Sequence, residues 1–153
     1  MSSTPLKIEA PRGMLHREAG PFEHLRFHPS PRLSSWIEHY WFVRWELDEP
    51  FVTKILAHPS VQVTVECLGR GKEVRAEVTG VRESRFERLL EGEGRVFGIK
   101  FRPAMFRSVF GKPMSSLTNS AMPLVECFER DGPASVESLV AAEETEDMTR
   151  HAE

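Results

Sequence analysis

The middle of the chain alternates apolar and polar residues in several short runs. Within residues 61–68, valines and Cys67 take every second position, and Gln62, Thr64 and Glu66 lie between them. A period of two is typical of a half-buried strand, because successive side chains point to opposite faces of a sheet. The same pattern predicts strands over residues 39–47, 51–57, 61–68, 72–79, 86–91 and 95–102.

Glycines mark the turns between these runs. Gly69 and Gly71 flank a predicted hairpin loop, and Gly92 and Gly94 separate the last two predicted strands. Short, regularly spaced strands with one apolar face each favour an antiparallel sheet that curls on itself. The predicted fold class is therefore mainly β with C-terminal helices (α+β), as an antiparallel cupin-like barrel or curled sheet with short flanking helices.

Helical patterns follow the last predicted strand. Pro103 ends that strand because it has no N–H for a ladder and suits the first turn of a helix, and Gly111 stands where a C-terminal cap would. Apolar residues at helical spacing predict further helices over residues 122–130 and from 133 to about 148. Acidic residues near the end of the last segment oppose the helix dipole, so we expect it to fray after about Ala142.

The same pattern divides the chain into three parts. Prolines without sustained periodicity predict an extended arm over residues 1–30, within which short strand pairings stay open. Residues 31–132 form a predicted β-rich domain, and residues 133–153 a helical or acidic tail or linker. With 153 residues, 40% hydrophobic and 28% charged, the chain has the size and composition of one globular domain.

Charge and composition narrow the classes of function. A formal net charge of −3 argues against a chain that itself binds nucleic acid, which would show a basic excess. No apolar run approaches the roughly 18 residues of a membrane helix, and the N-terminus lacks the apolar core of a signal peptide. We expect Cys67 and Cys127 to be buried free thiols, and the protein to be cytoplasmic with no membrane contact.

Catalytic and metal-binding patterns have little support. Two histidine pairs are candidates for a metal site with Glu38 or Glu66: His24 and His28, which are four apart, and His39 and His58, if these approach each other in the sheet. The His-x-His pattern of a cupin metal site is absent, and His24 and His28 lie in a proline-flanked segment that need not be helical. The chain has no Gly-x-Ser-x-Gly elbow, and neither cysteine has the local context of a catalytic thiol. We predict no enzyme activity, no catalytic or metal-binding residue and no cofactor.

Aromatic residues concentrate in residues 36–45, which hold three tryptophans. Trp41 and Trp45 would face one side of the predicted strand, and Tyr40 and Phe42 the other. At least one face must therefore bury aromatic side chains against a helix, a second subunit or a ligand.

Most of these aromatic residues are expected to serve as ordinary core. As an alternative, they line a hydrophobic ligand pocket in which Arg44, Glu66 or Arg102 orients the ligand. The predicted ligand-binding residues are Trp36, Tyr40, Trp41, Trp45, Glu66, Phe97 and Phe101.

Several short motifs resemble the sensor domain of AraC-type bacterial transcriptional regulators. A Gly-x-x-Phe-x-Pro turn occupies residues 98–103, a small-residue turn occupies residues 115–119, and a Pro-Leu pair that begins a helix occupies residues 123–124. Upstream, the resemblance continues in Pro31-Arg32-Leu33 and in the pair Tyr40-Trp41. It covers roughly residues 29–132, although His58-Pro59-Ser60 stands where the family usually has Pro-Asp-Gly.

The resemblance implies an N-terminal ligand-sensing and dimerisation domain that controls an attached DNA-binding domain. A small-molecule effector or a partner on the sheet would change how two protomers of a homodimer pair, and so the spacing of the DNA-reading helices. DNA contact would come only through a C-terminal helix-turn-helix domain, which is expected to be missing from this chain.

Two functions from other classes stay open. A small cupin-like metal-dependent enzyme would purify with a stoichiometric metal. A stand-alone protein-interaction or antagonist domain would have a native gene product that stops at Glu153.

Overall fold

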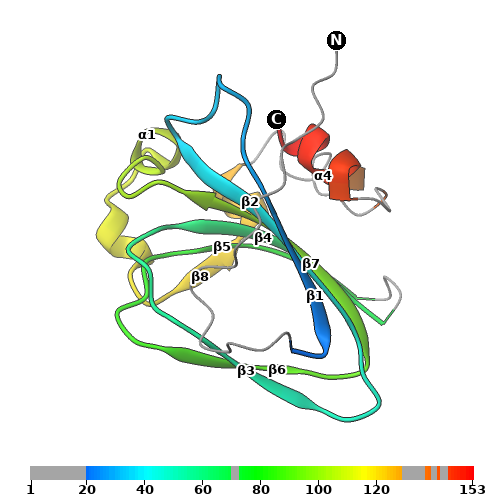
Figure 1. Ribbon diagram of the computed structural model, residues 1–153. Helices are drawn as coiled ribbons and strands as arrows, with labels where there is room; N and C mark the ends of the chain where they lie inside the picture. Colours follow the sequence, from blue (N-terminus) through cyan, green and yellow to red (C-terminus); the bar gives the residue numbers. More distant parts are fainter. Residues whose placement is uncertain (1–19, 70–72, 129–136, 139–140, 142–144) are drawn as a thin grey trace.

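The computed structural model describes residues 20–69, 73–128, 137–138, 141 and 145–153, and most of these build a curled antiparallel sheet (Figure 1). Its six strands follow the order β1-β2-β7-β4-β5-β8, and the two edge strands do not pair with each other, so the sheet is not closed into a barrel. Of the two predicted forms, a closed barrel and a curled sheet, the structure has the curled sheet. The strands are β1 (Phe22–Phe27), β2 (Ile37–Glu46), β7 (Glu93–Phe101), β4 (Gln62–Leu68), β5 (Glu73–Thr79) and β8 (Ala121–Pro123).

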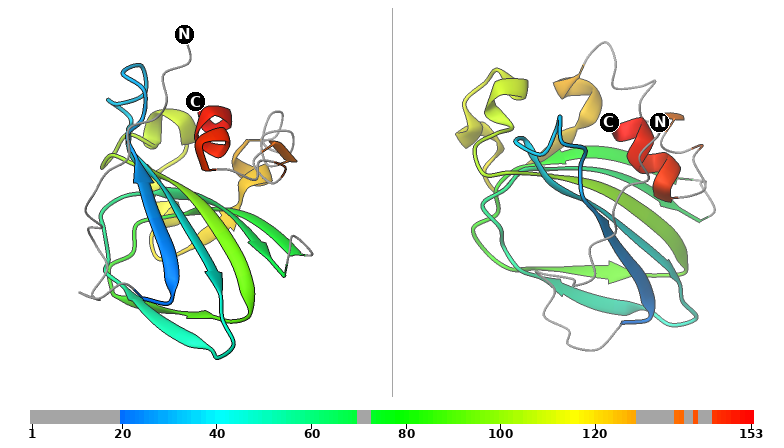
Figure 2. Two further views of the ribbon diagram at one scale, coloured as in Figure 1. Left: turned by 45° about the vertical axis from the view of Figure 1, so that its right-hand side comes forward. Right: turned by 45° about the horizontal axis from the view of Figure 1, so that its top comes forward.

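A second, two-stranded sheet pairs β3 (Phe51–Ile55) with β6 (Phe86–Leu90). It lies apart from the larger sheet, opposite one of its faces (Figure 1). We call that face of the six-stranded sheet the inner face. The opposite side carries the helices, as both views of Figure 2 show, and we call it the helix face.

All six strands predicted from the alternation are present, with ends shifted by a few residues at most. The hairpin pairing of β4 with β5 is confirmed, and its register places Val65 opposite Ala76. Two strands are additional. β1 belongs to the segment predicted as an extended arm and pairs with β2 from Phe22 opposite Trp45 to Phe27 opposite Tyr40, whereas residues 1–19 of that arm lie outside the described residues.

The helices after β7 are shorter than predicted. Gly111 has φ 67° and caps α1 (Arg107–Phe110), which confirms the predicted glycine stop. The turn between Pro103 and α1 holds Ala104 at φ 66°, so the helix begins later than the proline. A 3₁₀ turn at Met114–Leu117 precedes β8. The helix predicted over 122–130 is only α2 (Leu124–Cys127), because Met122 and Pro123 pair with β5 instead.

The expected fraying after Ala142 is wrong, because α4 (Thr145–Ala152) is helical. Met148 is only 3% exposed and packs into the core on the helix face. The last residue, Glu153, accepts hydrogen bonds through Oε1 from the Tyr40 hydroxyl at 3.2 Å and from the Ser30 backbone N–H at 2.8 Å. Burial of an apolar side chain therefore outweighs the unfavourable charge at this helix end. Most of residues 133–144 lie outside the described residues.

Two separate hydrophobic clusters lie on the two faces of the sheet. On the helix face, Tyr40 and Phe42 pack with Phe97, Phe106 and other residues of the turn and helices. On the inner face, Val43 and Trp45 pack with Leu90 and Val96, and Phe51 of β3 joins them. The predicted division of β2 into two aromatic faces is confirmed, and helices cover one face while the smaller sheet covers part of the other. No helix in the described part of the chain is long and apolar enough to cross a membrane.

Candidate ligand-binding site

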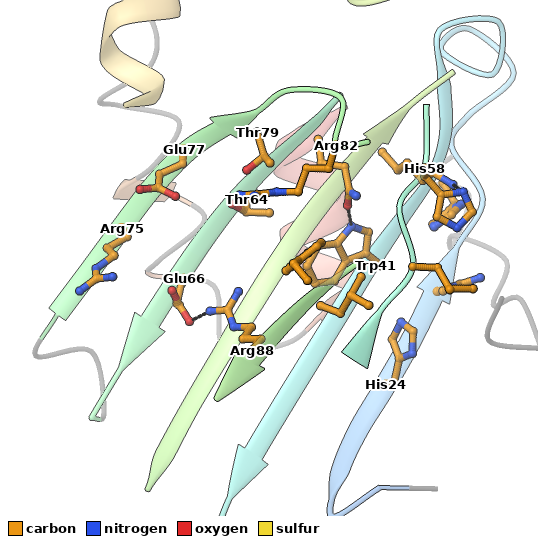
Figure 3. A pocket seen from close by; sticks show the side chains of 17 residues that line it. His24, Trp41, His58, Thr64, Glu66, Arg75, Glu77, Thr79, Arg82 and Arg88 are labelled. Carbon is orange, nitrogen blue, oxygen red and sulfur yellow. Dashed lines mark hydrogen bonds and ion pairs between the residues drawn. The ribbon is translucent and has the colours of Figure 1, made fainter. Parts of the chain in front are cut away.

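A cavity of about 210 Å³ lies on the inner face, between the six-stranded sheet and residues of the smaller sheet and its adjoining loops (Figure 3). We call it the inner cavity. It is smaller than the roughly 300–1,000 Å³ of pockets for drug-sized ligands, which indicates a small ligand. The residues that line it are His24, Arg26, His39, Trp41, Ile55, Leu56, His58, Gln62, Thr64, Glu66, Arg75, Glu77, Thr79, Arg82, Phe86, Arg88 and Lys100.

Strand alternation places these polar side chains in the cavity. On β4, Gln62, Thr64 and Glu66 line it, whereas Val63 and Val65 between them are buried on the helix face. The same alternation sends every second residue of β5 into the cavity. A sheet with one apolar face and one polar face thus covers a core on one side and presents a binding surface on the other.

Trp41 has a fixed orientation at the wall of the cavity. Its indole Nε1 donates a hydrogen bond of 2.9 Å to Oε1 of Gln62 on β4. Trp41 is paired in register with Gly98 of β7, and a Cβ atom at Gly98 would overlap the indole ring. The ring therefore lies against the bare backbone of the next strand, as a flat apolar platform beside the polar side chains.

An ion pair connects the two sheets at the cavity. The Arg88 guanidinium on β6 donates to the carboxylate of Glu66 on β4, and the Glu66 side chain is only 13% exposed (Figure 3). Burial lowers the pKa of Arg88 from its ordinary value. The Arg88 side chain is 32% exposed, so the pair is only partly buried. It joins β4 to β6 and so helps to position the smaller sheet over the larger one.

Lys100 provides a buried positive charge at another part of the cavity wall. Lys100 is only 7% exposed. Its Nζ lies 3.1 Å from Oε1 of Glu38 and 3.5 Å from Nδ1 of His58. Burial alone would raise the pKa of Glu38, but the hydrogen bond and the charge of Lys100 outweigh it and lower that pKa. An ammonium group has three donors, so Lys100 serves both neighbours and is suited to a third acceptor.

Three histidines line the same cavity, and the pKa of each is lowered chiefly by burial. Burial, with the charge of Arg26, lowers the pKa of both His24 and His39 to about 4. Burial followed by the charge of Lys100 lowers the pKa of His58. His39 and His58 both line the cavity: Nδ1 of His39 lies 3.6 Å from Oε1 of Glu38, and Nδ1 of His58 lies 3.5 Å from Nζ of Lys100. Within the described residues, however, no group of three or more potential metal ligands is present.

The structure divides the predicted ligand-binding residues between the two faces. Trp41 and Glu66 line the inner cavity, and Trp45 lies further along the inner face in its apolar cluster. The others are elsewhere: Tyr40, Phe97 and Phe101 are buried in the core on the helix face, and Trp36 is 42% exposed. Arg44 and Arg102, proposed as orienting groups, are both exposed and outside the cavity lining.

Sequence reasoning missed most of the basic lining. Arg26, Arg82 and Lys100 were not singled out, although they line the cavity. The position of Lys100 was predictable from the sequence. It alternates with Phe97 and Ile99 in the strand pattern, so it must lie on the same face as Gly98. Arg82 lies between β5 and β6, so only the folded chain places it.

One family is similar to this chain. A family model described as "Domain of unknown function (DUF6597)" matches residues 25–123, which reach from the middle of β1 to the end of β8. The match includes every residue that lines the inner cavity except His24. Neither the curated proteins nor the solved structures include a match.

Proposed function

The chain belongs to the DUF6597 domain family, and we propose that it is the ligand-sensing domain of an AraC-like transcriptional regulator. The observation that carries the proposal is the inner cavity, with its fixed indole and its buried Lys100 on the polar face of a sheet whose other face is covered by helices. A concave site with a few convergent polar groups is the usual form of a small-molecule site.

The position of the cavity supports sensing rather than storage of a ligand. Trp41 and Tyr40 are neighbours on β2, and they point to opposite faces of the sheet. Trp41 lines the cavity, and the hydroxyl of Tyr40 donates to Glu153 at the end of α4. A ligand that shifts β2 would therefore also change the contact that holds α4, which is the element nearest the chain's C-terminus.

The AraC-type motif supports the regulator part of the proposal. Gly98 of this motif lies under the Trp41 ring, and Phe101 packs edge-on against Phe106 with ring centroids 4.9 Å apart. Pro103 lies two residues after the end of β7, where the chain leaves the sheet. The motif residues thus have structural roles next to the cavity wall and in the core below it.

The proposal has further parts that rest on the resemblance. The domain pairs as a homodimer, resides in the cytoplasm, has no enzyme activity, and contacts DNA only through a helix-turn-helix domain. Dimerisation is checked by light scattering of the purified chain, for which a dimer gives twice the 17.5 kDa of one chain.

The regulator proposal is tested in the native organism by transcript profiling. Deleting the gene should change the transcripts of a small set of genes. A strain with Trp41→Ala should change the same set, because the substitution removes the platform of the cavity. The matched control is Arg44→Ala, an exposed residue of the same strand outside the cavity lining, which should behave as wild type.

Protein levels are compared in all strains by immunoblot, so that loss of the protein is not mistaken for loss of sensing. A deletion strain with an unchanged transcript profile would refute the regulator. A Trp41→Ala strain with normal protein level and a wild-type profile would remove the inner cavity from the mechanism.

A further inference from the structure

The charge of the inner cavity differs from that of the chain as a whole. Five of its lining residues are Arg or Lys and two are Glu, whereas the chain has a formal net charge of −3. Three of these cations have carboxylate partners, because Arg88 pairs with Glu66, Lys100 with Glu38 and Arg75 with Glu73. When Glu38 and Glu73 are added to the two lining glutamates, five cations face four carboxylates. The cavity therefore has an excess of positive charge in partly buried surroundings, where charges are screened less than on the surface.

The pKa values of the three histidines in the cavity are affected by the same positive charges. The charge of Arg26 acts on His24, His39 and His58 to lower each pKa, and the charge of Lys100 acts on the last two in the same direction. Glu38 is the acidic group that opposes this effect at His39 and His58. Burial is the largest cause of each lowered pKa, and the positive charges of Arg26 and Lys100 add to it in the direction that also favours a bound anion.

Arg82 has the geometry of an anion-binding group. Its guanidinium carbon lies 4.8 Å from the centre of the Phe86 ring, which holds the side chain in place. Its Nε is buried and has no hydrogen-bond partner among the described residues. In Figure 3, Arg82 reaches over the inner face of the sheet, where Thr64 and Trp41 also lie. A guanidinium presents parallel N–H donors that match the two oxygens of a carboxylate.

The remaining walls are suited to a flat apolar group. The Trp41 ring is fixed by Gln62 and by the bare backbone of Gly98. Ile55 and Leu56, from β3 and the residue after it, supply aliphatic side chains to the same cavity. A planar ring stacked on an indole gains more than its buried area alone, because aromatic faces prefer offset stacking.

We propose that the inner cavity binds a small planar organic carboxylate, whose carboxylate group pairs with Arg82 and whose ring packs on Trp41. Lys100 contributes to the positive field that favours the anion. This inference deepens the proposed sensing function and rests on the same cavity, but it can be tested without any transcriptional readout.

The test is calorimetric titration of the purified protein with two matched pairs of probes, nicotinate against nicotinamide and 2-furoate against 2-furamide. Each pair keeps the ring and replaces the carboxylate with a neutral amide. We expect at least one acid to bind with a Kd near or below about 1 mM, and its amide to bind at least about 10-fold more weakly, since a charge-assisted pair is lost.

The variant test uses two arginines of the same loop region. Arg82→Gln should weaken acid binding by about 10-fold or more and leave amide binding unchanged. Arg85→Gln is the control, because Arg85 is exposed and does not line the cavity. Lys100→Gln, compared with Lys54→Gln on the exposed surface of β3, is the second variant pair. Thermal unfolding of each free variant confirms that it is folded.

The outcomes separate this inference from the regulator proposal. Equal affinity for acids and amides, no binding of either acid up to about 10 mM, or unchanged acid binding in folded Arg82→Gln would overturn the carboxylate site. Acid binding that depends on Arg82, in a protein whose gene deletion changes no transcripts, would retain the carboxylate site and overturn only the regulator.

Discussion

At the scale of single residues, the most constrained contact of the inner face is the one between Trp41 and Gly98. The two residues are directly paired across β2 and β7, and the indole occupies the space that a side chain on Gly98 would fill. A non-glycine residue there must displace either the ring or the strand. The shape of the cavity wall therefore depends on the glycine at position 98 as much as on the indole of Trp41.

Gly98→Ala is therefore expected to destabilise the protein by about 1–3 kcal/mol, the usual range for overpacking a buried site. Urea unfolding measures the loss, and tryptophan fluorescence reports the displaced ring. In a Trp41→Ala background the added methyl group has room, so the same glycine substitution should cost much less. Equal costs in the two backgrounds would show that the overlap is not the cause.

The buried histidines make the stability of the fold dependent on pH. The pKa of His39 is lowered to about 4, chiefly by burial and then by the charges of Arg26 and Lys100, with the Glu38 carboxylate opposing and His24 adding a small lowering effect. In the unfolded chain the ordinary pKa is about 6.5. Between about pH 4 and pH 6.5 the unfolded state binds more protons than the folded state, so the free energy of unfolding rises with pH. The stability that neutral His39 contributes is therefore lost as the pH falls through this window.

Lowering the pH from about 7 to about 4 should therefore destabilise the protein by up to about 3 kcal/mol through His39, at about 1.4 kcal/mol per pKa unit. His39→Gln should reduce this pH dependence, whereas His28→Gln, at an exposed position after β1, should leave it unchanged. Chemical denaturation at a series of pH values measures the slope. An identical slope in wild type and His39→Gln would contradict the assignment.

At the scale of elements, α4 is stabilised by what it covers rather than by its own sequence. It has eight residues, which is too short for an isolated helix in water, and its acidic composition is unfavourable near its end. Met148 and Thr149 are nevertheless almost fully buried, and Glu153 accepts hydrogen bonds from Tyr40 and Ser30. Burial and the nearby Glu153 carboxylate raise the pKa of Tyr40, so its hydroxyl stays a donor at neutral pH.

Met148→Ala should consequently cost about 2 kcal/mol or more and release α4 from the sheet, because a buried methionine side chain is lost. Arg150→Ala is the control in the same helix, since Arg150 is exposed and forms an ion pair with the Asp147 side chain, which is 43% exposed. Its effect should stay within about 0.5 kcal/mol. Limited proteolysis near the C-terminus, read by mass spectrometry, detects the released helix. Similar cleavage of the two variants would refute the anchoring role of Met148.

At the scale of the whole molecule, the distribution of charge decides which partners the chain attracts. The net charge is −3, and five of the 20 Arg and Lys residues point into the inner cavity. An anion of small size can reach these cations, whereas the phosphate backbone of a duplex needs a basic outer surface.

The purified chain should therefore show no binding to duplex DNA in electrophoretic mobility assays, even at a low salt concentration of about 50 mM, where counterion release favours association most. The native gene product is assayed in parallel for comparison. Its DNA targets are the promoters of the genes whose transcripts change when the gene is deleted. Strong binding by this chain alone, weakening steeply with salt, would mean that it carries its own nucleic-acid surface.

Local alternation in the sequence was enough to predict six of the eight strands of the described residues, the turns between them and which residues of each strand share a face, but not β1 or β8. This was readable because alternation is a local property, and each of the six predicted strands, including the run of valines in β4, appeared where the period of two placed it. The glycine stop at Gly111 and the two aromatic faces of β2 were predictable for the same reason.

Which face of the sheet meets the helices, and which residues gather around the cavity, depends on contacts between segments far apart in the chain. Alternation says that Trp41 and Tyr40 point apart, but not which of them meets a cavity and which meets α4. Arg26, Glu66 and Lys100 come from β1, β4 and β7, which are distant in the sequence, and β6 pairs with β3 rather than with its neighbour β7. Such pairings depend on long-range packing free energy, which a local pattern does not contain, so the charge and shape of the cavity emerge only when the whole chain has folded.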